Sequence, residues 1–416
     1  MDSVFDLIII GGGAAGLSAA QYRAAAFEEV ARAVAMAFEP ASEPRPAAIA
    51  HDQVVWVTTP ARLDFGGGWS DTPPISIELG GTVVNAAVTL NGQYPIQVVA
   101  KLNTERTIRL ASIDLGERLT LRSAAEVLDH RDPSHWAALP KAALVLSGIV
   151  PSRRDQSLQR WLDALGGGLD LTIFSALPKG SGLGTSSILG AATIACLGRV
   201  RGEPSSQERI IALTSILEQR MRTGGGWQDQ IGGIVPGVKL IRTVPGAAQA
   251  VSLNWTVFDL GPESPLRRRC LLYFTGQKRM ARHILHNIVG HYLARDPATL
   301  ATVDALKASA LEMKSALDAR DTDAFARGIE RYWTLKKQID PGSTNPRIEA
   351  LLASVDRWTA GRVLPGAGGG GFVLFVARDA DAAGRIRRYL EAHPAHPTAR
   401  FFDFDVDDKG LNTTVL

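Results

Sequence analysis

One stretch of the sequence predicts most of the fold, and it reads Pro178-Lys179-Gly180-Ser181-Gly182-Leu183-Gly184-Thr185-Ser186-Ser187. An apolar run over residues 169–176 precedes it and predicts a strand. An alanine-rich run over residues 188–197 follows it with helical spacing. The stretch is therefore predicted to be a glycine loop that connects a strand to the start of a helix.

The composition of this loop favours a phosphate. Glycines at every second position allow backbone conformations closed to other residues and let a ligand approach the amides. The unpaired N–H groups and the positive dipole end at a helix start attract an anion. Thr185, Ser186 and Ser187 add hydroxyls, one of which could ligate the Mg²⁺ that accompanies a nucleoside triphosphate. Taken alone, the loop leaves open the alternative of a glycine-serine turn with a helix cap.

Two more glycine-rich stretches lie on either side of it in the sequence. They are Pro60-Ala61-Arg62-Leu63-Asp64-Phe65-Gly66-Gly67-Gly68-Trp69-Ser70-Asp71 and Gly366-Ala367-Gly368-Gly369-Gly370-Gly371-Phe372. In this order, the three stretches resemble the three signatures of the GHMP kinases, which include galactokinase, homoserine kinase and mevalonate kinase. The resemblance implies an α+β fold of two lobes. The first lobe is expected to resemble ribosomal protein S5 domain 2, and the second to be ferredoxin-like.

The resemblance also implies roles for single residues in phosphoryl transfer. All of Pro178–Ser187 would bind the ATP co-substrate, and Ser186 with Glu218 would ligate Mg²⁺. Asp229, in an Asp-Gln pair after three glycines, resembles the general base of the sugar kinases. Arg62 could supply positive charge that lowers the pKa of the acceptor hydroxyl and offsets charge on the transferring phosphoryl group.

The acceptor is implied to be a sugar. Asp71 matches the family's sugar-binding carboxylate, whose two oxygens suit vicinal hydroxyls, and Thr72 and Gly369 are expected to contact the substrate as well. Trp69 and Trp227 lie in glycine loops, where an exposed indole would be explained by stacking on the C–H face of a pyranose. The alternative for either indole is to fill the interface between the lobes.

The tryptophans narrow the resemblance to the L-fucokinase branch, which includes the kinase half of bifunctional fucokinase/GDP-fucose pyrophosphorylases. The matching segments are residues 68–74, 225–230 and 273–281. This resemblance implies conversion of L-fucose and ATP to L-fucose 1-phosphate and ADP. A heptose-phosphate kinase, a kinase of another 6-deoxy sugar and a non-catalytic sugar-binding module are the alternatives. One departure is Val363, which replaces a lysine often found three residues before the third glycine loop.

The N-terminus carries a different pattern. Residues 6–17 match the strand-GxGxxG-helix fingerprint of flavin and nicotinamide enzymes, so an FAD-linked protein is a further alternative. A dinucleotide domain requires a second strand with an acidic residue about 20 residues later. Here a helical pattern continues to Phe38, and a proline-rich linker follows over residues 39–46. We therefore expect an N-terminal segment over residues 1–50, an ATP-binding lobe over 51–240 and a second lobe over 241–416.

Composition limits the class of protein. A chain of 416 residues with 45% hydrophobic content can bury a large core, and a net charge of +3 without basic patches does not indicate nucleic-acid binding. Cys196 and Cys270 lie in apolar runs and are expected to be buried thiols. No run has the length of a membrane span, and the N-terminus has no secretory signal pattern. A cytoplasmic protein is expected, and the choice between monomer and homodimer stays open.

Between the signatures, the alternation of apolar residues predicts strands over residues 54–58, 82–90, 96–102, 107–113 and 118–121. Residues 135–150 and 206–221 have helical spacing, and residues 151–168 are predicted to be a polar connection. Towards the C-terminus we expect a strand over residues 269–274, a helical block over 278–339 and a single strand over 401–406.

Overall fold

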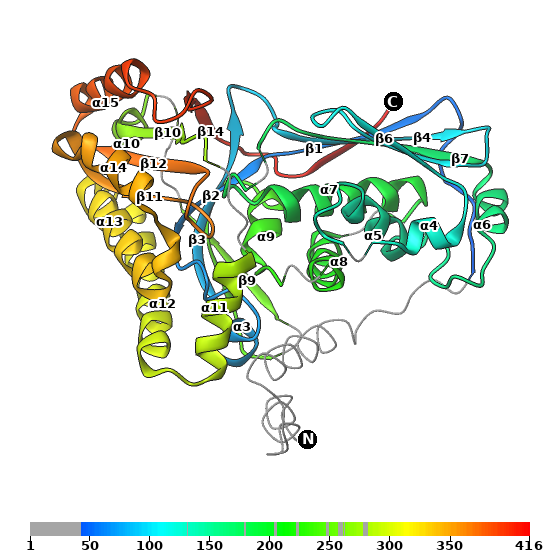
Figure 1. The fold of residues 1–416 in the computed structure, drawn as a ribbon, viewed down its shortest axis with the longest axis horizontal. Helices are drawn as coiled ribbons and strands as arrows, with labels where there is room; N and C mark the ends of the chain where they lie inside the picture. Colours follow the sequence, from blue (N-terminus) through cyan, green and yellow to red (C-terminus); the bar gives the residue numbers. More distant parts are fainter. Residues whose placement is uncertain are drawn as a thin grey trace.

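The structure, a computed structural model, describes residues 43–416 apart from 131, 179, 204–205, 222–223, 247–248, 257–260, 262 and 278–281. The flavin-like residues 6–17 and Lys179 of the phosphate loop lie outside the described residues. The chain forms two lobes with a third sheet between them (Figure 1). Runs of strands and runs of helices follow one another along the chain, and the sheets are mainly antiparallel, so the predicted α+β two-lobe fold is confirmed. No helix in the described ranges is long and apolar enough to cross a membrane.

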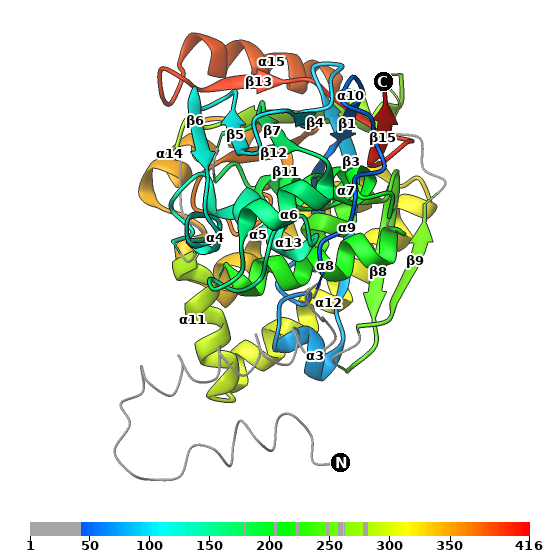
Figure 2. The same ribbon diagram turned by 90° about the vertical axis from the view of Figure 1, so that its right-hand side faces the viewer.

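The first lobe is a sheet covered on one face by helices (Figures 1 and 2). Its strand order is β15-β1-β4-β7-β5-β6, with bounds Asn412–Val415, Val54–Thr59, Ile96–Asn103, Gly168–Ser175, Ile108–Ser112 and Glu117–Leu121. Side chains on β4 alternate between buried and partly exposed, as a one-sided sheet requires. The covering helices are α4 (Ala124–Leu128), α5 (Ala138–Leu146), α6 (Leu158–Leu165), α7 (Thr185–Val200) and α8 (Gln207–Arg220).

The middle sheet lies between the lobes and carries the first signature. Its strands are β14 (Phe404–Val406), β3 (Thr82–Leu90), β8 (Val238–Thr243) and β9 (Val251–Trp255), and β2 (Ala61–Gly66) also pairs with β3. Two short helices flank it, α3 (Ile75–Leu79) and α9 (Gln228–Ile234). Every residue of β2 is buried, because elements of both lobes pack against this strand. The first signature therefore faces the junction of the lobes.

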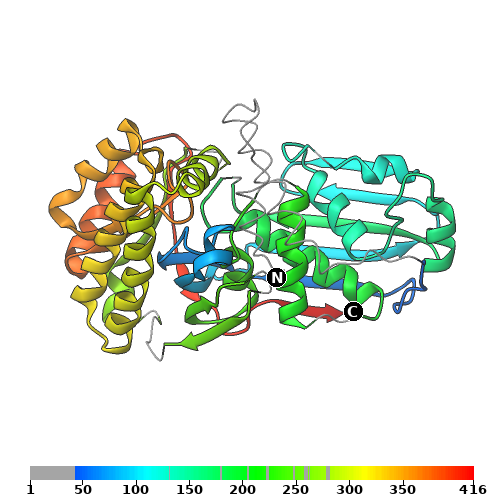
Figure 3. The same cartoon turned by 90° about the horizontal axis from the view of Figure 1, so that it is seen from below.

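The second lobe is an antiparallel sheet with long helices beside it (Figure 3). The sheet order is β11-β12-β10-β13, with bounds Thr359–Val363, Phe372–Ala377, Cys270–Phe274 and Arg400–Phe402. Its helices are α10 (Pro265–Arg269), α11 (Arg282–Leu293), α12 (Pro297–Asp318), α13 (Thr322–Ile339), α14 (Pro346–Ser354) and α15 (Ala380–Ala392), with 3₁₀ turns at Pro341–Ser343 and Asp356–Trp358. The order of strands and helices along the chain is that of the expected ferredoxin-like fold.

Two of the predicted elements are wrong. The polar connection over 151–168 contains helix α6, which Ser157 caps and whose apolar side chains at Leu158, Trp161, Leu162 and Leu165 face the core. The single strand predicted over 401–406 is two strands, β13 and β14, which pair with β10 and β3 in different sheets. The predicted helical block is three helices, since Asp296 and Asp321 each cap a new start.

The last strands of the chain pair with strands from its first part. Strand β15 pairs with β1 from Val55 opposite Val415 to Thr58 opposite Asn412, and β14 pairs with β3. Residue 240 lies in strand β8, which forms a hairpin with β9. The predicted lobe boundary at residue 240 falls within β8, and the division into lobes over 51–240 and 241–416 stays a prediction. Residues 404–415 belong with the first lobe and the middle sheet.

Candidate active site

Hydrogen-bond donors elsewhere in the protein hold the phosphate loop through its backbone carbonyl groups. The carbonyl oxygen of Ser181 accepts from the Phe372 N–H at 3.0 Å. Arg62 makes the other two bonds: its guanidinium donates to the Gly182 carbonyl at 3.0 Å, and its backbone N–H donates to the Leu183 carbonyl at 3.2 Å. Gly180, Gly182 and Gly184 have positive φ angles of 74°, 80° and 77°, which only glycine adopts readily. With the carbonyl groups directed at protein donors, the start of α7 is free to face an anion.

The third glycine loop packs directly on the phosphate loop. A Cβ on Gly182 would lie 2.4 Å from the Pro365 oxygen, and one on Gly366 would lie 2.9 Å from the Gly182 oxygen. A Cβ on Gly371 would lie 2.3 Å from the Ser181 oxygen. The two loops are therefore in backbone contact, and glycine is required on both sides. This contact brings the second and third signatures together across the lobes.

A cavity of about 510 Å³ opens beside the phosphate loop. One end is lined by Arg62, Asp229, Gly366 and six loop residues: Gly180, Ser181, Gly182, Gly184, Thr185 and Ser186. The other end is lined mainly by apolar side chains from the first lobe, with a few polar ones among them: Leu115, Trp136, Leu139, Ile173, Leu177, Leu189 and Met221, with Ser112, Asp114, His135 and Ser175. A cavity that is polar at one end and apolar at the other suits a phosphorylated molecule with an aromatic base. The sequence did not indicate these apolar residues, because they are scattered over several elements.

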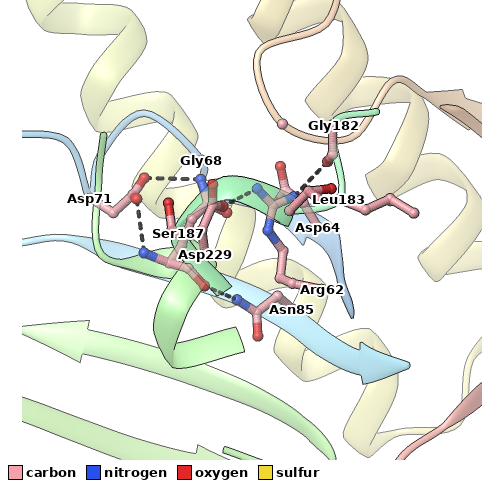
Figure 4. Close-up of polar contacts among 12 residues, drawn as sticks. Arg62, Asp64, Gly68, Asp71, Asn85, Gly182, Leu183, Ser187 and Asp229 are labelled. Atoms are coloured by element: carbon pink, nitrogen blue, oxygen red, sulfur yellow. Dashed lines mark hydrogen bonds and ion pairs between the residues drawn. The ribbon is translucent and has the colours of Figure 1, made fainter. Parts of the chain in front are cut away.

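Arg62 and Asp229 form an ion pair at the polar end of this cavity (Figure 4). Arg62 is 2% exposed, and the same guanidinium that pairs with Asp229 also donates to the Gly182 carbonyl. Burial disfavours the arginine cation, but the carboxylates of Asp229 and Asp64 outweigh burial and raise the pKa of Arg62. Arg62 therefore stays charged, and Asp229 is 28% exposed towards the cavity. The structure brings together the two residues predicted to be catalytic.

Asp71 lies close by but is enclosed (Figure 4). One carboxylate oxygen accepts from the Trp69 N–H and the Gln228 side-chain amide, and the other accepts from the Gln228 N–H, each at 3.1 Å. A Cβ on Gly226 would lie 1.9 Å from this carboxylate. Asp71 thus joins the first signature to the start of α9, one residue before Asp229. It is 1% exposed, so contact with a sugar hydroxyl stays a prediction.

The environment of Asp71 predicts a pH dependence of stability. Burial, followed by the charge of Asp229, raises the pKa of Asp71 to about 7, although the Gln228 N–H bond acts in the opposite direction. The folded state therefore binds this proton more tightly than the unfolded state, whose carboxyl has an ordinary pKa. The contribution to stability is complete below pH 4 and is lost as the pH rises through 7, by at most roughly 4 kcal/mol.

Urea unfolding of wild type and Asp71→Asn from pH 4 to 8 measures this effect. We expect the wild-type free energy of unfolding to contain a fall that the variant lacks, because asparagine is neutral throughout. Asp52→Asn, at an exposed position, is the control and should keep the wild-type profile. Parallel profiles for wild type and Asp71→Asn would contradict the prediction.

The other predicted sugar contacts are also buried. Trp227 packs in an apolar cluster with Val83, Ile231 and Ile241, and its indole N–H donates to Gln249 at 3.2 Å. Trp69 has a positive φ of 78° and packs in the main core. Both indoles are buried in the interior and are not exposed in their loops. Thr72 is buried, and Gly369 is held by Ser343 and Asn345. Sugar contact by these four residues stays a prediction.

The predicted magnesium ligands are Ser186 and Glu218, and their coordination of the ion stays a prediction. Glu218 on α8 accepts from the Ser187 hydroxyl at 2.8 Å, and both side chains are buried. Ser186, the predicted partner, is exposed and lines the cavity instead. Consecutive residues at a helix start point about 100° apart, so Ser187 faces α8 when Ser186 faces the cavity. The observed pair is Ser187 with Glu218.

The donor set at this point suits magnesium. Mg²⁺ is usually bound by one or two carboxylates, with substrate phosphates and water completing its shell. Here one carboxylate and two serine hydroxyls lie at the start of α7, beside the polar end of the cavity. Within the described ranges, no group of three or more His, Cys, Asp or Glu side chains gathers to hold a metal by itself. The site therefore fits an ion that arrives with a nucleotide.

Known proteins resemble this chain in sequence. The chain is 39% identical over 366 residues to the L-fucokinase/L-fucose-1-P guanylyltransferase of Bacteroides fragilis, an alignment that covers 87% of this chain and 39% of that protein. It is 36% identical over 337 residues to the bifunctional fucokinase/GDP-fucose pyrophosphorylase of Arabidopsis thaliana, covering 81% of this chain and 31% of that protein. The chain thus spans about two fifths or less of the length of these relatives.

Solved structures and family models agree with the fold. A D-glycero-D-manno-heptose 1-phosphate kinase from a Bacteroides species superposes with a TM-score of 0.63 at 20% identity, covering 86% of this chain and 98% of that one. The sequence matches the GHMP kinases N terminal domain over residues 155–237 and the GHMP kinases C terminal domain over residues 313–396. With both domains matched and the three signatures gathered at one cavity, the chain belongs to the GHMP kinase family.

Proposed function

We propose that this protein is an ATP-dependent sugar kinase that converts L-fucose to L-fucose 1-phosphate. The observation that carries the proposal is the Arg62–Asp229 pair, placed where the phosphate loop meets the cavity. The choice of sugar is supported by similarity to the two fucokinase-containing relatives, whose names include this activity.

The proposed reaction is an in-line transfer. The sugar hydroxyl oxygen forms a bond to the γ-phosphorus of ATP as the bond from that phosphorus to the bridging oxygen of ADP breaks. Asp229 accepts the hydroxyl proton. Arg62 remains cationic beside it and offsets negative charge on the transferring group. The N–H groups at the start of α7 bind the phosphates, and the apolar end of the cavity excludes water from the base.

We also propose that Glu218 and the serines at the start of α7 hold Mg²⁺ with the nucleotide phosphates. When bound, the ion would neutralise phosphate charge and orient the triphosphate. This assignment rests on the Ser187–Glu218 contact and on the suitability of the oxygen donors.

Glu218→Gln tests the magnesium proposal. Loss of the carboxylate charge is expected to raise the Mg²⁺ concentration for half-maximal activity about tenfold or more, in the range observed when residues supporting a metal site are changed. The measurement is initial rate against free Mg²⁺ at constant ATP. Glu208→Gln, an exposed change on the same helix, is the control. An unchanged Mg²⁺ midpoint in Glu218→Gln would remove this residue from the metal site.

A panel of sugars tests the activity itself. We expect ADP release with L-fucose to exceed that with D-galactose, other 6-deoxy sugars, heptose 7-phosphate and heptose 1-phosphate. Strong preference for a heptose phosphate would assign the chain to that class instead. Sugar binding without any ADP release would identify a non-catalytic binding module. An absorption band of bound flavin in the purified protein would support the FAD alternative for residues 6–17.

A further inference from the structure

Helix α13 of the second lobe places a buried lysine at the site. Lys336 is fully buried, and its ammonium donates to the Leu364 carbonyl at 2.6 Å and to the Gly366 carbonyl. Both carbonyls belong to the third glycine loop or the residues that lead into it. The Lys336 nitrogen also lies 4.0 Å from a carboxylate oxygen of Asp64 on β2. One cation therefore joins the second lobe to two signatures.

Tyr332, one helical turn earlier, completes this network. Its hydroxyl donates to the same Asp64 oxygen at 2.7 Å and accepts from the Gly68 N–H at 3.1 Å. A Cβ on Gly68 would lie 2.4 Å from the hydroxyl oxygen, so the first glycine loop is shaped to receive it. Asp64 lies two residues from Arg62 on the same strand (Figure 4). Its charge is among those that keep Arg62 protonated.

The sequence suggested a loss of positive charge near the third loop, because Val363 replaces a lysine there. In the structure Val363 is buried in the main core. The adjacent Arg362 pairs with Glu330 and Asp356. Lys336 donates to the loop, and it comes from helix α13 and not from strand β11.

We propose that Lys336 and Tyr332 are positioning residues, which hold the third glycine loop against the phosphate loop and hold Asp64 beside Arg62. Lys336 holds the third glycine loop through the carbonyl of Gly366, which packs on Gly182. The second of the two actions works through Asp64, a buried carboxylate that accepts from the Tyr332 hydroxyl and lies 4.0 Å from the Lys336 ammonium. The inference rests on the proposed kinase activity for its catalytic part, whereas nucleotide binding tests its structural part independently.

The charges around Lys336 predict how the activity of the protein depends on pH. Burial lowers the pKa of the Lys336 ammonium to about 8, while Asp64 and Asp229 act against this shift and Arg62 adds to it. The nearby Tyr332 hydroxyl has a pKa raised well above its ordinary value, first by burial and then by Asp64, so it stays protonated. Activity that depends on the lysine charge falls as the pH rises through about 8.

Lys336→Met is the main test, with Lys337→Met as the matched control. Lys337 is the next residue on α13, is 37% exposed and pairs with Glu349 on the surface. We expect Lys336→Met to weaken ADP binding about tenfold and to lower kcat/KM about 10- to 100-fold, as small misplacements of reacting groups do. The fall in activity near pH 8 should be absent from this variant. Lys337→Met should match wild type in all three measurements.

Tyr332→Phe keeps the proposal testable if Lys336→Met does not fold. It removes one hydroxyl that contacts Asp64 and Gly68 but not the third loop. We therefore expect kcat to fall about tenfold with ADP affinity unchanged. Folded Lys336→Met with wild-type ADP affinity and kcat/KM, or Tyr332→Phe with wild-type kcat, would overturn the proposal. If wild type phosphorylates no sugar, the proposed function fails, and ADP affinity of the lysine variants still decides the structural part.

Discussion

Replacing Asp229 by asparagine is expected to lower kcat about a thousandfold while ADP still binds. Asparagine has the same shape and can accept the Arg62 bond through its carbonyl oxygen, so the polar end of the cavity should keep its geometry. It cannot take the proton of the sugar hydroxyl. General-base catalysis contributes about 10²- to 10⁴-fold to rates, which sets the size of the loss. Initial rates and calorimetric titration with ADP measure the two effects separately.

Asp114→Asn is a matched control within the same cavity. Asp114 lines the cavity and accepts from the Ser112 hydroxyl at 3.0 Å and from the Ser175 N–H at 3.3 Å. It lies with the apolar residues of the first lobe, so its loss should change KM for ATP more than kcat. Near wild-type kcat in Asp229→Asn would remove Asp229 as the base. Asp71, whose pKa is raised to about 7, would then be the next carboxylate to test.

Gly371→Ala should disrupt the contact between the second and third signatures. Gly371 has a φ of 82°, and a Cβ there would lie 2.3 Å from the Ser181 oxygen and 2.8 Å from the Gly180 oxygen. Positive φ costs an ordinary residue roughly 1–2 kcal/mol, and displacing two carbonyl groups adds to that. We expect a loss of at least about 3 kcal/mol in the free energy of unfolding and a severe loss of ADP affinity.

Gly92→Ala separates the cost of a positive φ from the cost of displacing neighbouring carbonyl groups. Gly92 has a φ of 74°, and a Cβ there would meet no atom within 4 Å. Its substitution should therefore cost only the conformational term, about 1 kcal/mol, and leave ADP affinity unchanged. Urea unfolding and ADP titration of both variants give the comparison. Equal losses in the two variants would show that the packing of Gly371 on the phosphate loop contributes nothing.

Local patterns were sufficient for the elements whose burial has a simple period. The strand predicted over 82–90 matches β3 at both ends, and those predicted at 54 and 96 start where β1 and β4 start. Strand β2 was not predicted, because it is buried on both sides and ends in three glycines, which read as a loop. Helix α6 was missed because exposed polar residues and a glycine run obscured its short apolar face.

Site residues could be predicted from the sequence only where a local motif is associated with one function. The glycine signatures gave Arg62 and the phosphate loop, and the Asp-Gln pair after residues 224–226 gave Asp229; the structure gathers all of them at one cavity. That Ser187 contacts Glu218 while Ser186 lines the cavity depends on the rotation of a helix start, which residue spacing does not define. Lys336 lies in a Lys-Lys pair that reads as exposed helix surface. Its partners Asp64 and Gly366 are distant in sequence, so no local pattern could indicate its burial.

The pairing of β15 with β1 bears on how the chain folds during synthesis. The first and last described strands share an edge, so a nascent chain on the ribosome can complete the nucleotide-binding sheet only after residue 415 has emerged from the exit tunnel. Pairings that join the two ends of a chain also slow folding, because a long loop must close first. Unfolding of this protein should therefore be cooperative across both lobes, with a single transition when β-sheet circular dichroism and tryptophan fluorescence are monitored together.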